Sequence, residues 1–127
     1  MSAATRKKFA NEGASYILFS SVAAYEGSMG ILAYAEAKAG VQAGVKSMAR
    51  EIARRRQRVN SISPAWVDTE MTQNYLQSTG IPDDHRNGCL GEGKPEDVAG
   101  MALFLLSDRA KMVNGTDIVV DGGFLLG

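Results

Sequence analysis

The chain has 127 residues, of which 45% are hydrophobic and 22% charged, and its 14 Lys and Arg residues balance its 14 Asp and Glu residues. A net charge of zero argues against a nucleic-acid partner, and no apolar run is long enough to span a bilayer. A single cysteine, Cys89, and a single histidine, His85, exclude an internal disulfide and argue against a bound metal. We therefore expect one cytoplasmic domain over residues 1–127, with neither a metal nor a membrane partner.

The first predicted elements are a basic N-terminal segment and a strand. Residues 1–12 contain a run of basic residues but no apolar stretch of the kind found in a signal peptide. We interpret this segment as a short amphipathic helix, with a transit peptide as the alternative because no acidic residue occurs before Glu12. Residues 15–20 are almost continuously apolar, which predicts a strand buried on both faces.

A long amphipathic helix is predicted over residues 33–55, because this stretch lacks proline and repeats apolar side chains at spacings of three and four. Arginines between positions 54 and 58 close the pattern and suit the negative end of the helix dipole. Gly40 and Gly44 each weaken a helix by up to about 1 kcal/mol. We therefore expect a close helix neighbour to compensate for these two glycines.

Residues 58–63 alternate apolar and polar side chains and stop at Pro64, which predicts a second strand. A strand, a long helix and a second strand form a βαβ unit, in which the two strands run parallel and the crossover is right-handed. The sequence therefore predicts an α/β fold.

The remaining predicted elements are a short helix, a second long helix and a third strand. Residues 64–94 are irregular and are interpreted as a lid-like segment, with a short helix at about 69–77. Pro95 begins a helix that ends near residue 108, with two carboxylates in its first turn, where the helix dipole favours negative charge. Residues 118–120 follow an Asn-Gly turn and predict a third short strand.

Chemically useful side chains gather where the predicted strands end. Tyr34 and Lys38 lie one turn apart on the long helix, and a nearby ammonium favours the ionised form of a phenol, which suits general acid–base catalysis. Ser21 follows the first strand, and residues 64–69, in which Trp66 would cover the site, follow the second. Because ligands of parallel α/β sheets bind at the carboxyl ends of the strands, we expect these segments to converge on one crevice.

Other candidate motifs have weaker support. Asp83 with Asp84, and Glu96 with Asp97, are neighbours in sequence, so neither pair has the facing arrangement of a glycosidase dyad. Residues 91–93 read Gly-Glu-Gly but lack the third glycine and the preceding strand of a dinucleotide-binding loop.

The spacing of Ser21, Tyr34 and Lys38 resembles the active-site pattern of the short-chain dehydrogenase/reductase family, in which a Tyr follows a Ser by thirteen residues and a Lys follows the Tyr by four. The similarity runs in order along most of the chain. It includes the segments 19–23, 33–40, 58–60, 64–71, 94–99 and 119–123. The C-terminal segments are most similar to the 3-oxoacyl thioester reductase and the sugar or alcohol dehydrogenase branches of the family.

This resemblance implies the C-terminal portion of a Rossmann-like, doubly wound parallel sheet. It also implies an oxidoreductase that transfers a hydride between NAD or NADP and a small carbonyl or alcohol substrate. The N-terminal, dinucleotide-binding half of such a fold is missing, because the chain has no glycine-rich phosphate-binding fingerprint. Ala65 stands where the family usually has Gly, and its methyl group would crowd the nicotinamide loop.

The resemblance also assigns roles to individual residues. Tyr34 would exchange a proton with the substrate oxygen, Ser21 would donate a hydrogen bond to the same oxygen, and Lys38 would support Tyr34 and bind the nicotinamide ribose. The cofactor-binding residues of the following loop would be Pro64, Val67 and Thr69. A capping or loop role is the alternative for Ser21, and a helix N-cap role is the alternative for Thr69.

The missing half leads to an expectation about partners. The first strand would lack its usual neighbour, and an unpaired apolar strand edge favours association. We expect the chain to fold with a missing N-terminal half or with a second copy in a homo-oligomer, and the resemblance would place Gly40 and Gly44 at a subunit interface. The alternative function is a non-catalytic truncated remnant, or assembly module, that cannot bind the dinucleotide.

Overall fold

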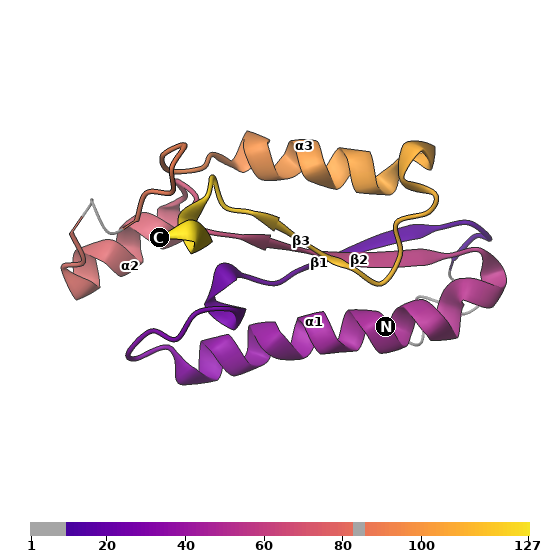
Figure 1. Cartoon of the computed structure of the whole chain (residues 1–127), viewed down its shortest axis with the longest axis horizontal. Helices are drawn as coiled ribbons and strands as arrows, with labels where there is room; N and C mark the ends of the chain where they lie inside the picture. Colours follow the sequence, from indigo (N-terminus) through magenta and orange to yellow (C-terminus); the bar gives the residue numbers. More distant parts are fainter. Residues whose placement is uncertain (1–9, 83–85) are drawn as a thin grey trace.

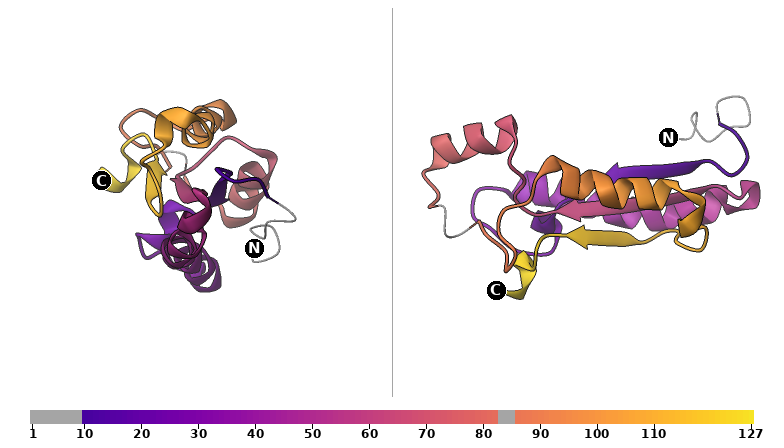
Figure 2. Two further views of the ribbon diagram at one scale, coloured as in Figure 1. Left: turned by 90° about the vertical axis from the view of Figure 1, so that its right-hand side faces the viewer. Right: turned by 90° about the horizontal axis from the view of Figure 1, so that it is seen from above.

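The computed structural model describes residues 10–82 and 86–127, which form a three-stranded parallel sheet with a long helix on each face (Figure 1). The elements in chain order are β1 (Ser15–Phe19), α1 (Leu32–Ile52), β2 (Arg58–Pro64), α2 (Glu70–Thr79), α3 (Pro95–Leu106) and β3 (Asp117–Val120). Figure 2 shows α1 and α3 on opposite sides of the sheet, while α2 projects beyond one end of it. The predicted α/β fold with a βαβ unit is confirmed.

The strand order β1-β2-β3 places β2 in the centre of the sheet. Ile17 pairs with Asn60 and Ile62 pairs with Ile118, and both pairings are parallel. The side chains of β1 are only partly buried, and that of Phe19 is 51% exposed. The prediction that β1 is buried on both faces is therefore wrong for the described chain, because β1 is an edge strand with a neighbour on one side only.

Two hydrophobic layers hold the helices to the sheet. Beneath α1, the buried side chains are Val45, Ala49, Ile52 and Val59. Beneath α3, the buried side chains are Ile62, Leu105 and Ala110. Successive residues of β2 therefore contribute to opposite layers, as the alternation of side chains along a strand requires.

The polar residues of β2 are buried as deeply as its apolar ones, because other side-chain and backbone groups satisfy them. The Arg58 guanidinium donates hydrogen bonds to the carbonyl oxygens of Val113 (3.2 Å) and Ser107 (3.1 Å). The Asn60 amide donates to the same Val113 oxygen (2.9 Å) and accepts from the Thr116 N–H (3.1 Å). Arg58 thus belongs to the buried strand, as the strand predicted over residues 58–63 requires, and the other arginines of the run lie at the helix end.

Gly40 and Gly44 lie on the exposed side of α1, away from its buried stripe. A methyl group added at either position would meet no atom of the described chain within 4 Å. The expected helix neighbour is therefore not found within residues 10–82 and 86–127. The surface of α1 around the two glycines is not covered by any described residue.

Several expectations fall partly or wholly outside the described residues. These are the helix predicted for residues 1–12, of which 1–9 lie outside and 10–12 are not helical, and the residues Asp83, Asp84 and His85. In the part of the chain that the structure describes, no helix combines the length and the apolar character needed to cross a bilayer.

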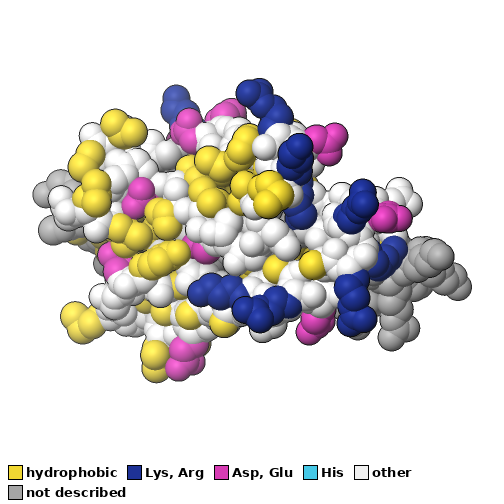
Figure 3. All heavy atoms as spheres, turned by 45° about the vertical axis from the view of Figure 1, so that its right-hand side comes forward, with side chains coloured by type: hydrophobic (Ala, Val, Ile, Leu, Met, Phe, Trp, Pro, Cys, Tyr) yellow, Lys and Arg dark blue, Asp and Glu magenta, His cyan; other side chains and the backbone are white. Residues whose placement is uncertain are grey.

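Helix α3 exposes apolar side chains on its outer face. Figure 3 shows hydrophobic side chains gathered over this helix, where Leu103, Phe104 and Leu106 are 69%, 42% and 48% exposed. Burying such side chains is favourable by roughly 25 cal/mol per Å². This face is therefore a place where association would stabilise the chain.

Candidate active site

A cavity of about 330 Å³ lies at the carboxyl ends of β1 and β2. The residues predicted to be catalytic or to bind the cofactor all line it: Ser21, Tyr34, Lys38, Pro64, Val67 and Thr69. A second hollow of about 400 Å³, lined by Lys46, Arg50 and Gly115, contains none of these residues. The first cavity is therefore the candidate active site.

Ser21 occupies the turn that leaves β1. It is the N-cap of the short 3-10 helix η1 (Val22–Ala24), and its Oγ accepts a hydrogen bond from the Ala23 N–H at 3.2 Å. The capping role given as the alternative for Ser21 is therefore present. A hydroxyl that accepts at a cap still has its own proton to donate, so capping and substrate binding are compatible.

Tyr34 and Lys38 lie in the first turns of α1, facing the end of β1. The Lys38 ammonium donates a hydrogen bond to the Phe19 carbonyl oxygen at 3.0 Å and lies 5.5 Å from the centroid of the Tyr34 ring. Tyr34 is 46% exposed, and its hydroxyl forms no hydrogen bond with any described residue. The phenol is therefore available to a ligand, with a cation held beside it.

Ser20, which directly follows β1, links this strand to α1 by a hydrogen bond. It is 4% exposed, and its Oγ donates a hydrogen bond to the Lys38 carbonyl oxygen at 2.9 Å. Together with the bond from the Lys38 ammonium to Phe19, this makes two hydrogen bonds that run in opposite directions between β1 and α1. The sequence did not single out Ser20, because a side-chain bond to a distant carbonyl leaves no local pattern.

Val67 is held in the loop after β2 by a bridge to Gly93. The Gly93 N–H donates to the Trp66 carbonyl (3.1 Å), and the Asp68 N–H donates to the Gly93 carbonyl (2.9 Å). The bridge engages the residues on either side of Val67, whose own N–H and C=O form no hydrogen bond within the described chain. Val67 thus offers one backbone donor and one backbone acceptor at the cavity.

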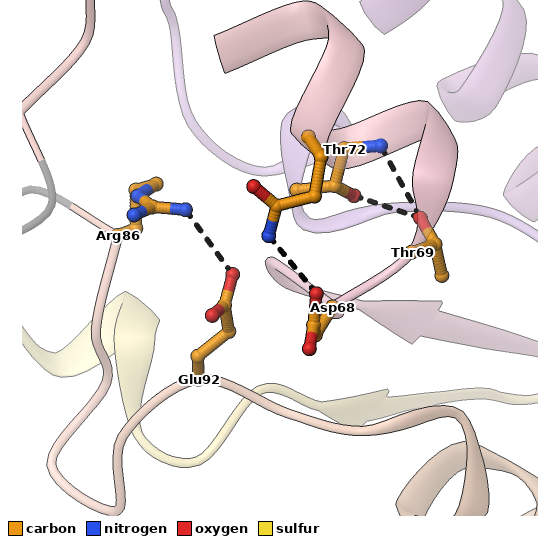
Figure 4. Close-up of polar contacts among 6 residues, drawn as sticks. Asp68, Thr69, Thr72, Arg86 and Glu92 are labelled. Carbon is orange, nitrogen blue, oxygen red and sulfur yellow. Dashed lines mark hydrogen bonds and ion pairs between the residues drawn. The ribbon is translucent and has the colours of Figure 1, made fainter. Parts of the chain in front are cut away.

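Thr69 is the N-cap of α2 and lies just before its first turn, as Figure 4 shows. Its Oγ1 accepts a hydrogen bond from the Thr72 N–H at 3.2 Å, so the N-cap role given as its alternative is present. Trp66 does not line the cavity, contrary to expectation, because its ring packs against Tyr75 of α2 with centroids 6.0 Å apart. Met71 at the start of α2 lines the cavity instead.

The acidic residues of the described chain form neither a metal site nor a catalytic pair. No group of three or more His, Cys, Asp or Glu side chains could hold a metal within residues 10–82 and 86–127. Asp97 accepts a hydrogen bond from the Lys94 N–H at 2.8 Å and so caps α3. Glu92 forms an ion pair with Arg86 at 3.3 Å in the loop before α3 (Figure 4).

The comparisons with known proteins identify the family to which this parallel α/β fold belongs. A family model described as Enoyl-(Acyl carrier protein) reductase matches residues 1–125. The chain belongs to the short-chain dehydrogenase/reductase family and is similar to its 3-oxoacyl reductases.

Individual relatives show the same likeness. The 3-oxoacyl-(acyl-carrier-protein) reductase FabG of Thermotoga maritima is 37% identical over 118 residues, which cover 88% of this chain and 46% of that protein. A short-chain type dehydrogenase/reductase from Mycobacterium ulcerans matches in structure with a TM-score of 0.82 and 37% identity, over 91% of this chain and 42% of that one. A 4-hydroxyisoleucine dehydrogenase mutant, in complex with NADH and succinate, matches with a TM-score of 0.80 and 30% identity over 89% of this chain and 47% of that one.

The chain thus spans about half the length of the curated relatives that it matches. The predicted identity as the C-terminal portion of a Rossmann-like sheet is consistent with this coverage.

Proposed function

We propose that this chain supplies the catalytic half of a reductase that transfers a hydride from NADH or NADPH to the carbonyl carbon of a 3-oxoacyl thioester or a related small ketone. The observation that carries the proposal is that Ser21, Tyr34 and Lys38 line the same cavity of about 330 Å³. The names of the relatives, a 3-oxoacyl reductase and an NADH-bound dehydrogenase, support this substrate and cofactor class.

The residues present fit the nicotinamide end of such a cofactor. The free N–H and C=O of Val67 complement a carboxamide, which itself has one acceptor and one donor group. Thr69 and Pro64 border the same space, and the cavity volume lies within the usual range for ligand sites, roughly 300–1,000 Å³. Bound there, the nicotinamide would supply the hydride.

Three side chains of the cavity would transfer the proton and stabilise the charge that develops during hydride transfer. As the carbonyl carbon accepts the hydride, negative charge develops on its oxygen, and Tyr34 would give its hydroxyl proton to that oxygen. Ser21 would donate a hydrogen bond to the same oxygen in the transition state. Lys38 would hold positive charge beside the phenolate that Tyr34 becomes, and would bind ribose hydroxyls through its remaining N–H groups.

Replacing Tyr34 with phenylalanine tests this assignment, with Tyr75→Phe as the matched control. Tyr75 lies outside the cavity lining, so its loss of a hydroxyl should leave turnover unchanged. We expect Tyr34→Phe to lower kcat for reduction of an acetoacetyl thioester by about a hundredfold or more, the usual contribution of a general acid. Loss of NADPH or NADH absorbance measures the rate, and equal turnover in the two variants would refute the role of Tyr34.

A second candidate is a non-catalytic assembly module, favoured by one observation: the chain covers only about half of its relatives. Fluorescence titration of NADH and NADPH with the full chain distinguishes the two candidates. Saturable binding supports the reductase. A titration that shows no saturation up to high micromolar cofactor would leave the assembly module as the function of this chain by itself.

A further inference from the structure

Asp117, the first residue of β3, lies at the centre of a hydrogen-bond network beneath α1. Its Oδ1 accepts a hydrogen bond from the Ser61 hydroxyl at 2.5 Å. Its Oδ2 accepts from the Ser63 hydroxyl at 2.7 Å, the Tyr25 hydroxyl at 2.6 Å and the Gln42 side-chain amide at 3.3 Å. Four donors from three other segments of the chain therefore meet on one carboxylate.

Part of this network is buried inside the fold. Ser61 and Ser63 are completely buried on the central strand, although a serine at such a position adds nothing to a hydrophobic layer. Gln42 also donates to the Ser63 hydroxyl at 3.1 Å, so the donors are linked to one another. Within the described residues, Asp117 has no cationic partner. Its charge is therefore satisfied by these neutral donors alone, which a partly buried carboxylate requires.

Three of the four donors lie next to a segment of the candidate active site. Tyr25 directly follows η1, the turn that Ser21 caps. Gln42 is one helical turn beyond Lys38 on the same face of α1. Ser63 directly precedes Pro64, where β2 ends and the cofactor loop begins. The chain places these segments far apart in sequence, and Asp117 joins them through side chains.

We propose that Asp117 is a positioning residue, which holds the Ser21 turn, the turn of α1 that follows Lys38 and the end of β2 in the one arrangement that the candidate active site needs. Its catalytic consequence rests on the function proposed above. The placement of the three segments is a separate claim, because it can be measured without turnover.

The geometry has a consequence for the ionisation of Tyr25. Burial of its hydroxyl, followed by the hydrogen bond to Asp117 and the charge of Asp117, raises the pKa of Tyr25 to about 12. The side chain is nevertheless 51% exposed. The hydroxyl is thus held against the carboxylate while much of the side chain faces solvent.

The test compares Asp117→Asn and Tyr25→Phe in the full chain, with Asp108→Asn as the matched control. Asp108 is an exposed residue at the start of η4 (Asp108–Ala110) and has no side-chain partner within the described chain. An amide at position 117 keeps the size of the side chain but has only one acceptor oxygen for the hydroxyls that surround it. Tyr25→Phe removes a single donor at the surface and is the milder change. It tests the network even if Asp117→Asn prevents the chain from folding.

Amide hydrogen exchange, resolved by peptide, is the main measurement. We expect Asp117→Asn to speed exchange about tenfold or more in residues 20–26 and 38–42, and Tyr25→Phe to do so in residues 20–26 only. Exchange in α3 should stay at the wild-type rate in both variants, and Asp108→Asn should change neither segment. Unchanged exchange in residues 20–26 would overturn the proposal, and so would a uniform increase that includes α3, which indicates general destabilisation.

Turnover provides a second readout that separates this proposal from the proposed function. If the wild-type chain is active, Asp117→Asn should lower kcat about tenfold or more with KM within about twofold, since misplaced groups act on the transition state. A matching fall in Asp108→Asn would contradict the role of Asp117. If the wild-type chain has no turnover while exchange changes locally as expected, the reductase function of the isolated chain fails and the positioning role stands.

Discussion

Replacing Asn60 with alanine should destabilise the chain far more than its position on an alternating strand suggests. Asn60 is completely buried, and its amide bonds the Val113 carbonyl (2.9 Å) and the Thr116 N–H (3.1 Å). After the change, the Val113 carbonyl keeps its bond from Arg58. The Thr116 N–H, however, loses the partner that Asn60 supplies.

The magnitude follows from these contacts. One lost hydrogen bond and one orphaned donor together cost about 2–4 kcal/mol. This is a large fraction of the roughly 5–15 kcal/mol by which small domains are stable. At a typical urea dependence, the midpoint of unfolding should fall by roughly 1–2 M.

Urea unfolding of the full chain, followed by circular dichroism, measures the effect. Asn74→Ala is the matched control, because Asn74 is exposed on α2 and forms no side-chain hydrogen bond within the described residues. Its free energy of unfolding should change by less than about 0.5 kcal/mol. A loss of similar size in the two variants would refute the argument that the hydrogen bonds of buried Asn60 stabilise the fold.

Three further predictions concern packing and ionisation. Gly88→Ala should cost about 1–3 kcal/mol, because its new methyl group would lie 2.6–2.7 Å from backbone atoms of residues 121–124. Gly100→Ala, which meets open space on α3, should instead stabilise the helix by up to about 1 kcal/mol. Equal effects of these two changes on the urea midpoint would contradict the packing argument. Tyr25 should ionise near pH 12 in the folded chain, against about 10 when unfolded. Because the folded state favours the neutral phenol, its contribution to stability is complete below about pH 10 and is lost as the pH rises to about 12. The difference in tyrosinate absorbance between wild type and Tyr25→Phe, measured against pH, checks this value. A difference with its midpoint near pH 10 would contradict it.

The helices were predictable because their determinants are local. The apolar spacing of α1 and the proline that opens α3 place these helices within a few residues of their observed bounds, Leu32–Ile52 and Pro95–Leu106. A 3-10 turn, η2 (Ala53–Arg55), follows α1 and accounts for the longer predicted helix. Periodicity and capping depend on residues a few positions apart, and these are visible in one sequence.

Burial and neighbours were less predictable, because they depend on residues distant in the chain. The alternation along β2 gave no sign that Asn60 and Ser61 are as buried as Val59. Their partners, Thr116 and Asp117, lie more than 50 residues away. Likewise, Trp66 was expected at the crevice, but it packs on a ring that only the docking of α2 brings beside it.

The sequence by itself determined the order of the elements and the family resemblance, and through that resemblance it pointed to six of the residues that line the cavity. Such patterns depend on residues close together in the chain. The roles of these residues stay predictions until they are tested. Tertiary structure alone decided that the Val67 N–H and C=O have no partner among the described residues, that Ser20 binds the helix at Lys38, and that Asp117 joins three segments of the site. Each of these depends on hydrogen bonds between distant segments, whose direction and length exist only once the sheet has brought those segments together.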